Sequence, residues 1–417
     1  VDRLEQALNK MVARHLGLRT IFINGKQQYL KAYSHYKIEL RELSNEDELL
    51  DIRNQLSHKI YNTEFFPLFD IRVSTFNNSY ILHISYDLLL IDASSSNVFF
   101  RELTQLYSDP ATVLPELRIN FRDYIDQYKK IRESKLFKDA EQYWLNKLNG
   151  YDFEMHLPLK VSASKIKEPK FTRITRTIKK EAWDTIQDKA RFKNISPTAI
   201  ILAIYGKVLS YWSGQEKVSI NLTLFNRLPL HPQINDIIGD FTVLELFNYV
   251  DGLGSITQRF KVIHEDLWND IEHNLFDGMD FQRLIKQEQL ASNNQIIAPV
   301  VLTSILGDQG NIEDEVFIDE SYQETIYSIS QTSQVWLDNK AYETDEGLVA
   351  EWDYVEGLFD QVVIKKIHDS YCMLIEQLAE VDWDKEGLPK IEINRADLKL
   401  IEDANNHQQE TSEDTLF

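Results

Sequence analysis

The chain has 417 residues, of which 43% are hydrophobic and 11% aromatic, enough apolar material for a packed core and for about two to three domains. Its 66 acidic residues outnumber its 45 basic residues. The resulting net charge of −21 disfavours binding to nucleic acid through phosphate contacts. No run reaches the roughly 20 apolar residues of a membrane helix, and the first eight residues carry three charges instead of a signal-peptide core. The composition predicts a soluble, cytoplasmic protein with neither a nucleic-acid nor a membrane partner.

Residue patterns that bind metals or nucleotides do not occur in the sequence. The ten histidines show no His-x-x-x-His spacing, and the single cysteine, Cys372, cannot form an internal disulfide. Neither Gly-x-Gly-x-x-Gly nor a Walker-type Gly-Lys-Ser/Thr loop is present. We therefore expect no metal centre and no bound ATP or NAD, and we interpret Cys372 as a buried structural thiol in a helix.

Helical and strand-like segments alternate along the first 160 residues. Apolar side chains at helical spacing predict a helix over residues 4–16, a second helix after Asp92 and a third over 139–148. Alternating and β-branched runs predict strands over residues 20–23, 28–30, 69–76 and 80–86. The run 87–92 lies between a strand and a helix, a position where active-site residues often occur.

A charged, proline-containing stretch over residues 156–170 interrupts this periodicity, and we place a lobe boundary at residue 160. Beyond it, Ser196-Pro197 has the form of an N-cap with proline in the first turn, and an almost wholly apolar helix runs to Trp212. Further strands are predicted over residues 217–225, 299–303, 335–338 and 349–353. The alternation predicts an α/β fold with domains over 1–160 and 161–400.

Several segments resemble the motifs of heterocyclization domains of nonribosomal peptide synthetases, which belong to the condensation-domain superfamily. In chain order they are Asp-Leu-Leu-Leu-Ile-Asp at 87–92, residues 222–232 followed by Gly-Asp-Phe-Thr at 239–242, Pro-Val-Val-Leu-Thr-Ser-Ile-Leu-Gly at 299–307, and Ile-Ser-Gln-Thr-Ser-Gln-Val-Trp-Leu-Asp at 329–338. Trp352-Asp353 fits the same family, so the resemblance covers nearly the whole chain. The tail 401–417 resembles the linker that leads from such a domain into an adenylation domain.

The resemblance implies two chloramphenicol-acetyltransferase-like lobes in a V-shaped pseudo-dimer with a tunnel between them. Phosphopantetheine arms of an upstream donor and a downstream acceptor carrier domain would enter the tunnel, so the domain itself would bind no cofactor. An adenylation domain would follow in the same polypeptide. Family members begin some tens of residues before the helix that opens this chain, so we expect the first strand and its aromatic-Gly-Arg motif to be missing.

Ordinary condensation domains carry His-His-x-x-x-Asp-Gly where this chain has residues 87–92, and Leu88 replaces the usual candidate base. Attack of an amine on a thioester depends mainly on orientation, so condensation without that histidine is chemically reasonable. We interpret Asp87 and Asp92 as structural. Asp92 alone would be read as a helix cap, and the resemblance implies an ion pair with Arg227 across the lobes.

Cyclodehydration is the step that needs acid and base catalysis. The resemblance implies that Asp338 is a proton shuttle to the departing hydroxyl and that Thr303 hydrogen-bonds it or the developing oxyanion. Without the motif context, Asp338 would be interpreted as a strand-end aspartate and Thr303 as a β-branched filler. Two residues are predicted to orient the carbonyl and two to contact the substrate: Gln331 and Asn226, then Trp336 and Ser304.

The implied enzyme condenses a donor acyl or peptidyl thioester with a carrier-bound Cys, Ser or Thr, and then cyclodehydrates the product to a thiazoline or oxazoline. Two alternatives stay open. A condensation-only acyltransferase would be favoured if Asp338→Ala left the product unchanged. A non-catalytic domain that docks carrier proteins is disfavoured, because it would not need Gln331 or Asp338.

Overall fold

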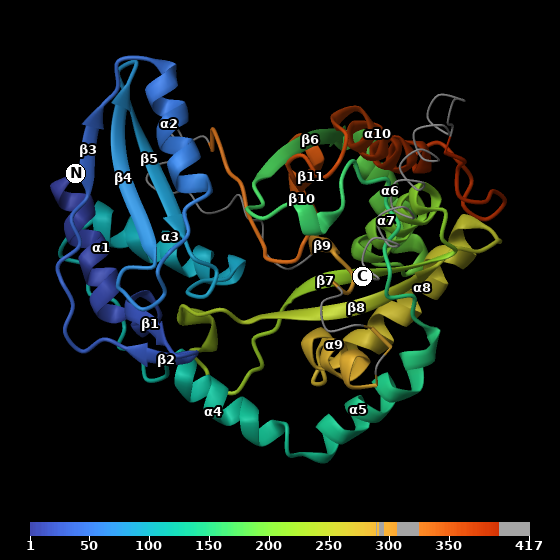
Figure 1. Ribbon diagram of the computed structural model, residues 1–417, viewed down its shortest axis with the longest axis horizontal. Coiled ribbons are helices and arrows are strands. Elements are labelled where there is room, and N and C mark those ends of the chain that lie inside the picture. Colours follow the sequence, from blue (N-terminus) through green and yellow to red (C-terminus); the bar gives the residue numbers. More distant parts are fainter. Residues whose placement is uncertain (289, 292–295, 307–324, 392–417) are drawn as a thin grey trace. The chain divides into compact units, whose positions relative to one another are not determined.

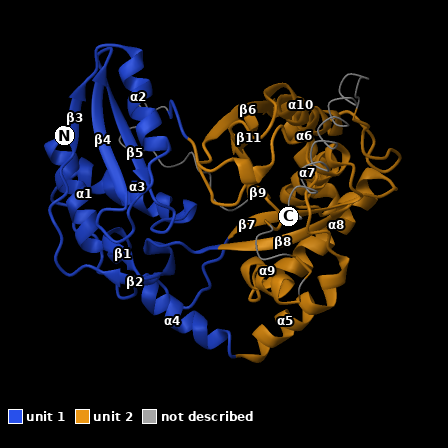
Figure 2. Ribbon diagram, viewed as in Figure 1, with its two compact units in different colours: residues 1–133, 225–242, 312–328 blue, residues 134–224, 243–311, 329–417 orange. Residues whose placement is uncertain are grey.

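The computed structural model describes residues 1–288, 290–291, 296–306 and 325–391 (Figure 1). By their mutual contacts the residues divide into two compact units (Figure 2). Unit 1 comprises the described residues of 1–133, 225–242 and 325–328, and unit 2 comprises the others. This division differs from the predicted boundary at residue 160, because residues 134–160 belong to unit 2 and residues 225–242 to unit 1. The predicted linker 401–417 lies outside the described residues.

Unit 1 is built around the three-stranded sheet β3-β4-β5. β4 (Phe69–Phe76) pairs in parallel with β3 (Glu39–Glu42) and antiparallel with β5 (Ser79–Tyr86). Buried apolar residues of α1 (Asp2–Arg14) and α3 (Ala93–Ser108) join those of β4 in one cluster. The remaining elements are β1 (Thr20–Ile23), β2 (Lys26–Tyr29), α2 (Glu46–Ser57), α4 (Phe121–Ile131) and the short 3-10 helices Leu16–Arg19 and Ile234–Asp236.

Asp92 lies between β5 and α3 and connects segments that are far apart in sequence. Its Oδ1 accepts a hydrogen bond from the Ser95 backbone N–H at 2.6 Å, which caps α3. The same oxygen pairs with Arg227 Nη2 at 3.2 Å, and Oδ2 accepts from the Phe241 backbone N–H at 3.0 Å. The carboxylate thus makes both the cap and the ion pair expected from the sequence. The pair lies within unit 1, however, because residues 225–242 belong to that unit.

Arg227 completes this connection on the other side. Its Nη1 donates to the carbonyl oxygens of Ile234 at 2.9 Å and Ile237 at 3.0 Å, and Nη2 donates to Ser95 Oγ at 2.6 Å. The guanidinium also lies 4.1 Å from the ring centroid of Phe241. Burial lowers the pKa of Arg227, while the charge of Asp92 opposes that shift. The segment 225–242 is therefore fastened to α3 by buried polar contacts.

Unit 2 contains a six-stranded mixed sheet in the order β6-β11-β10-β9-β7-β8 (Figure 1). β11 (Gly347–Val355) is antiparallel to both β6 (Phe171–Lys179) and β10 (Leu337–Thr344). β9 (Val300–Ile305) is parallel to β10 and to β7 (Lys217–Phe225). The other elements are β8 (Thr242–Val250), α5 (Lys135–Lys147), α6 (Lys180–Lys193), α7 (Pro197–Ser213), α8 (Ile256–Glu272), α9 (Gly278–Gln287), α10 (Gln361–Leu378) and the 3-10 helices Leu148–Gly150 and Ala163–Lys165.

The largest apolar cluster joins one face of this sheet to α6, α7 and α10. Ser196 caps α7 as predicted, and the apolar helix is buried on most sides. Cys372 in α10 has no exposed surface, and burial raises the pKa of its thiol to about 12, so the structural interpretation is confirmed. Along β10, Leu337 and Ala341 join the apolar cluster, and strand alternation directs Asp338 and Lys340 to the opposite face.

The turn between β10 and β11 contains only Asp345 and Glu346. Gly347 begins β11 with φ of +131°, and a Cβ there would collide with the backbone of Ile178 and Lys180. Glycine is the residue that adopts this φ without strain. The predicted strands 335–338 and 349–353 correspond to β10 and β11, although β10 begins at Leu337 and continues to Thr344. β1, β2, β4, β5 and β7 also overlap the predicted strands.

Within the described part of the chain, no single helix is long and apolar enough to cross a membrane. The bent pair α6 and α7 meets the length and composition criteria only when the two helices are taken together.

We predict that Gly206→Ala lowers the free energy of unfolding by about 1–3 kcal/mol, as overpacked core positions do. The added Cβ would overlap the Tyr249 ring, although alanine is the better helix former by about 1 kcal/mol. Chemical denaturation followed by circular dichroism measures the change. Gly150→Ala is the control, since its Cβ would meet no atom within 4 Å. Equal stability of the two variants would contradict the packing of α7 on β8.

Arg227→Met should lower the free energy of unfolding by about 3–5 kcal/mol, because the buried Asp92 carboxylate loses its cation. Their side chains are 7% and 0% exposed. Arg191→Met removes a pair with Asp188 whose side chains are 75% and 73% exposed, and should cost no more than about 1 kcal/mol. Adding Asp92→Asn to Arg227→Met should recover part of the loss. The same unfolding curve for both single variants would refute the role of the pair.

Candidate functional site

The face of the unit 2 sheet opposite α7 and α10 carries ionisable and hydroxyl side chains from neighbouring strands. In one row of the strand register, Arg173 of β6 pairs with Asp353 of β11, and Asp353 pairs with Asp338 of β10. In the next row on this face, Glu351 pairs with Lys340, and Lys340 pairs with Thr303 of β9. We call this set the polar face: Arg173, Thr303, Asp338, Lys340, Glu351 and Asp353.

Asp338 and Thr303, predicted from distant motifs, lie together on the polar face. Thr303 Oγ1 is 3.3 Å from Asp338 Oδ1 and 3.1 Å from Thr223 Oγ1. A hydroxyl carries one proton, so Thr303 donates to one of these oxygens at a time. Asp338 is 7% exposed and Thr303 8%. The result is a buried carboxyl group in contact with a hydroxyl that can both donate and accept.

Burial raises the pKa of the Asp338 carboxyl to about 6. The negative charges of Asp353 and Glu351 also raise the pKa, whereas Lys340 and the hydrogen bond from Thr303 lower it. A carboxyl group with a pKa in this range is populated in both protonation states near neutral pH. It can therefore serve in proton transfer in either direction.

The charged neighbours of Asp338 form a closed network. Arg173 donates two hydrogen bonds to Asp353, from Nε to Oδ1 at 2.6 Å and from Nη2 to Oδ2 at 2.7 Å. Its Nη1 forms an ion pair with Glu351 Oε2 at 2.9 Å. Burial alone would raise the pKa of Asp353, but Arg173 and Lys340 hold it below its ordinary value. No group of three or more His, Cys, Asp or Glu side chains among the described residues could hold a metal ion. The carboxylates of this network are held by cationic side chains.

Three other predicted residues of unit 2 lie close to Asp338 or Thr303 in sequence, in different settings. Ser304 follows Thr303 on β9, faces the other side of the sheet, and shares a 2.8 Å hydrogen bond with Thr198 Oγ1. Trp336 is half-buried just before β10, and its indole N–H has no partner among the described residues. Gln331 is half-buried in the segment that precedes it.

Asn226 and Asp87 belong to unit 1. The Asn226 backbone N–H donates to Phe241 O at 3.3 Å, and its carbonyl oxygen accepts from Tyr124 Oη at 3.2 Å. Asp87 Oδ1 accepts from the Leu89 backbone N–H at 3.0 Å, which stabilises the turn after β5. The structure therefore brings together Asp338 and Thr303, and the roles of Asn226, Gln331, Trp336 and Ser304 stay predictions.

Sequence reasoning gave no role to the residues that surround Asp338. Thr223 sits at a polar position of the strand predicted over 217–225, so alternation marked it as lying on a polar side. Arg173, Lys340 and Glu351 become neighbours only through the register of β6, β11 and β10. No local signal in the sequence could have paired residue 173 with residue 353.

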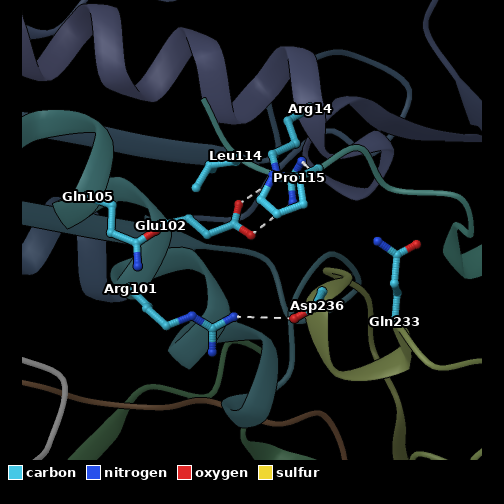
Figure 3. A pocket seen from close by; sticks show the side chains of 8 residues that line it. All are labelled: Arg14, Arg101, Glu102, Gln105, Leu114, Pro115, Gln233 and Asp236. Atoms are coloured by element: carbon cyan, nitrogen blue, oxygen red, sulfur yellow. Dashed lines mark hydrogen bonds and ion pairs between the residues drawn. The ribbon is translucent and has the colours of Figure 1, made fainter. Parts of the chain in front are cut away.

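A cavity of about 150 Å³ lies in unit 1 and contains none of the predicted site residues (Figure 3). Arg14 pairs with Glu102 at 2.8 Å, and Arg101 lies 3.8 Å from Asp236. Glu102 Oε2 is also 2.7 Å from Nε2 of the buried His15. The charged side chains that line the cavity are thus paired with one another. The cavity is also smaller than the roughly 300 Å³ at which ligand sites begin. We place the candidate site on the polar face instead.

Among relatives, the chain is similar to bacitracin synthase 1 of Bacillus licheniformis, with 32% identity over 419 residues. That match covers 98% of this chain and 8% of the relative. It is 29% identical over 386 residues to pyochelin synthetase PchF of Pseudomonas aeruginosa, covering 91% of this chain and 21% of the relative. The chain therefore spans a small part of these proteins.

Among solved structures, the chain resembles the EpoB cyclization-docking bidomain of a nonribosomal peptide synthetase from Sorangium cellulosum. The TM-score is 0.83 at 30% identity, over 93% of this chain and 79% of that one. The mixed α/β fold is thus shared with a cyclization domain. The family model of the condensation domain matches residues 1–386. On this match and this fold, the chain belongs to the condensation-domain family of nonribosomal peptide synthetases.

Proposed function

We propose that this domain is a heterocyclization enzyme, which forms an amide and then cyclodehydrates it. The observation that carries the proposal is the buried Asp338 carboxyl, 3.3 Å from the Thr303 hydroxyl and with a pKa of about 6. The likeness to a cyclization domain over most of the chain supports it. A condensation reaction alone would not require such a group, since amide formation from a thioester depends mainly on orientation.

In the first step, the amine of the carrier-bound acceptor attacks the donor thioester. A C–N bond forms, the thioester C–S bond breaks, and the donor carrier arm leaves as a thiol. In the second step, the acceptor's side-chain thiol or hydroxyl attacks the new amide carbonyl, whose oxygen becomes a hydroxyl. The C–O bond then breaks, the hydroxyl leaves as water, and the nitrogen loses its proton as C=N forms.

Asp338 acts in the second step. Its protonated form donates to the departing hydroxyl, and the carboxylate then accepts the proton that the nitrogen loses, which restores the starting state. Thr303 holds the carboxyl or the developing oxyanion by a hydrogen bond. Trp336 contributes a substrate contact, for which its indole N–H, without a partner in the described part of the chain, is suited. The resemblance also implies a substrate contact for Ser304 and carbonyl-orienting roles for Gln331 and Asn226, although Ser304 faces the other side of the sheet and Asn226 belongs to unit 1.

The proposal includes the architecture and partners implied by the resemblance. The substrates arrive on phosphopantetheine arms of an upstream donor and a downstream acceptor carrier domain, and an adenylation domain lies in the same polypeptide. The resemblance implies two chloramphenicol-acetyltransferase-like lobes, predicted over residues 1–160 and 161–400, whereas the contacts within the structure assign residues 134–160 to unit 2 and residues 225–242 to unit 1. Relatives much longer than this chain are consistent with such neighbours.

Asp338→Ala should slow water loss by at least about 100-fold, the low end for loss of general acid catalysis, and leave amide formation in place. The assay mixes the domain with an acyl-loaded donor carrier and a cysteine-loaded acceptor carrier, and follows the acceptor by intact-protein mass spectrometry. Asp251→Ala is the matched control, because Asp251 pairs with Lys207 and lies outside the polar face.

The unmutated domain decides between the alternatives in the same assay. Acyl transfer without loss of water would leave a condensation-only acyltransferase. No transfer at all would favour a domain that docks carrier proteins. Equal water loss by Asp338→Ala and the unmutated domain would remove Asp338 from the mechanism.

The rate of water loss should fall as the pH rises through about 6, because donation to the departing hydroxyl needs protonated Asp338. Amide formation should not fall over this range, since the attacking amine is more available at higher pH. Rapid-quench measurements of both products between about pH 5 and about pH 8 test this. A water-loss rate that increases through pH 6 would show that the carboxylate acts as a base in the slow step.

A further inference from the structure

Lys340 occupies a fixed position beside Asp338. It follows Asp338 by two residues on β10, so the two side chains share the polar face with Cα atoms about 6.6 Å apart, at about 3.3 Å per strand residue. Its Nζ lies 2.6 Å from Asp353 Oδ2 and 3.7 Å from Glu351 Oε1. With 17% of its side chain exposed, the ammonium group is held by two carboxylates instead of by water.

Arg173 brings the net charge of this arrangement to zero. Two cations, Arg173 and Lys340, balance two carboxylates, Glu351 and Asp353, and all four lie on neighbouring strands. Asp338, opposite Asp353 in the register, is the fifth ionisable group. Buried ion pairs contribute little net stability compared with apolar packing. Their presence next to a proton-transfer group therefore calls for a functional explanation.

The groups that face Asp338 come from several elements. β11 contributes Asp353 and Glu351, β9 contributes the uncharged Thr303, and β7 contributes the uncharged Thr223. Tyr205 of α7 acts on Asp338 from the helix side of the sheet, and burial raises its pKa well above the ordinary value, so it is neutral. In the strand register, Asp353 stands between Asp338 and Arg173, whereas Lys340 adjoins Asp338 on its own strand.

We propose that Lys340 is a positioning residue: clamped by Asp353 and Glu351, it supplies the positive charge that sets the balance between the acid and base forms of Asp338. The inference rests on the proposed function, since it concerns the water-loss step. Without Lys340, the two carboxylates of β11 act on Asp338 with less compensation, and the acid form persists to higher pH. Without Glu351, the opposite change follows.

Two variants with opposite expected effects test the inference. Lys340→Met should move the midpoint of the pH profile for water loss upward by about one unit, as removal of an adjacent opposite charge does. Glu351→Gln, which removes a negative charge and keeps the side-chain shape, should move it downward. Lys340→Arg keeps the positive charge and should therefore have the same midpoint as the unmutated domain. The profile for amide formation should stay in place in all three variants.

Lys207→Met is the matched control, because it removes a lysine 2.7 Å from Asp251 in the same unit but outside the polar face. It should leave the midpoint unchanged. If the unmutated domain loses no water, the proposed function fails. If it loses water but the midpoint shifts in neither Lys340→Met nor Glu351→Gln, or shifts in the same direction in both, the inference is refuted and the proposed function stands. Should Lys340→Met lack a cooperative melting transition, the direction found for Glu351→Gln decides.

Discussion

The removal of Asp338 from water is the constraint on which the site depends. An ionised carboxyl group in such a place is costly unless cations and hydrogen-bond donors surround it. The sheet supplies one hydroxyl and one ammonium group next to two further carboxylates, so neither protonation state is strongly favoured. A well-paired ion pair would hold the carboxyl group in its ionised form, whereas the polar face leaves both forms accessible. It keeps a carboxyl group available to exchange protons.

Asp92 is also a buried aspartate, but its surroundings differ from those of Asp338. Its carboxylate receives a cap hydrogen bond from Ser95, another from the Phe241 backbone, and the guanidinium of Arg227. With both oxygens occupied, it is suited to hold segments together and poorly suited to chemistry. Among the described residues, Asp338 receives a bond only from Thr303. This contrast explains why the double-aspartate motif identifies the family more readily than it explains a reaction.

The sequence predicted elements whose side chains alternate or repeat with a clear period, such as β7, the β4–β5 hairpin and α7. It did not predict β3, in which every residue is exposed, or the edge strand β6, whose threonine and arginine side chains blur the apolar pattern. The resemblance of segments 299–307 and 329–338 to family motifs pointed to Thr303 and Asp338 as candidate site residues. The surrounding charges could not be predicted, because they meet only through pairing of strands that are far apart in the chain.

The short turn between β10 and β11 fixes the register of the strands that carry this site. Because alternate strand residues face opposite sides, a shift of β11 by one position would exchange Asp353 and Glu351 for the apolar side chains beside them. Gly347, whose backbone conformation and close contacts exclude a side chain, limits such slippage. An insertion or deletion in this two-residue turn would therefore change which β11 side chains stand beside Asp338. The length of the hairpin thus fixes the set of charges on the polar face.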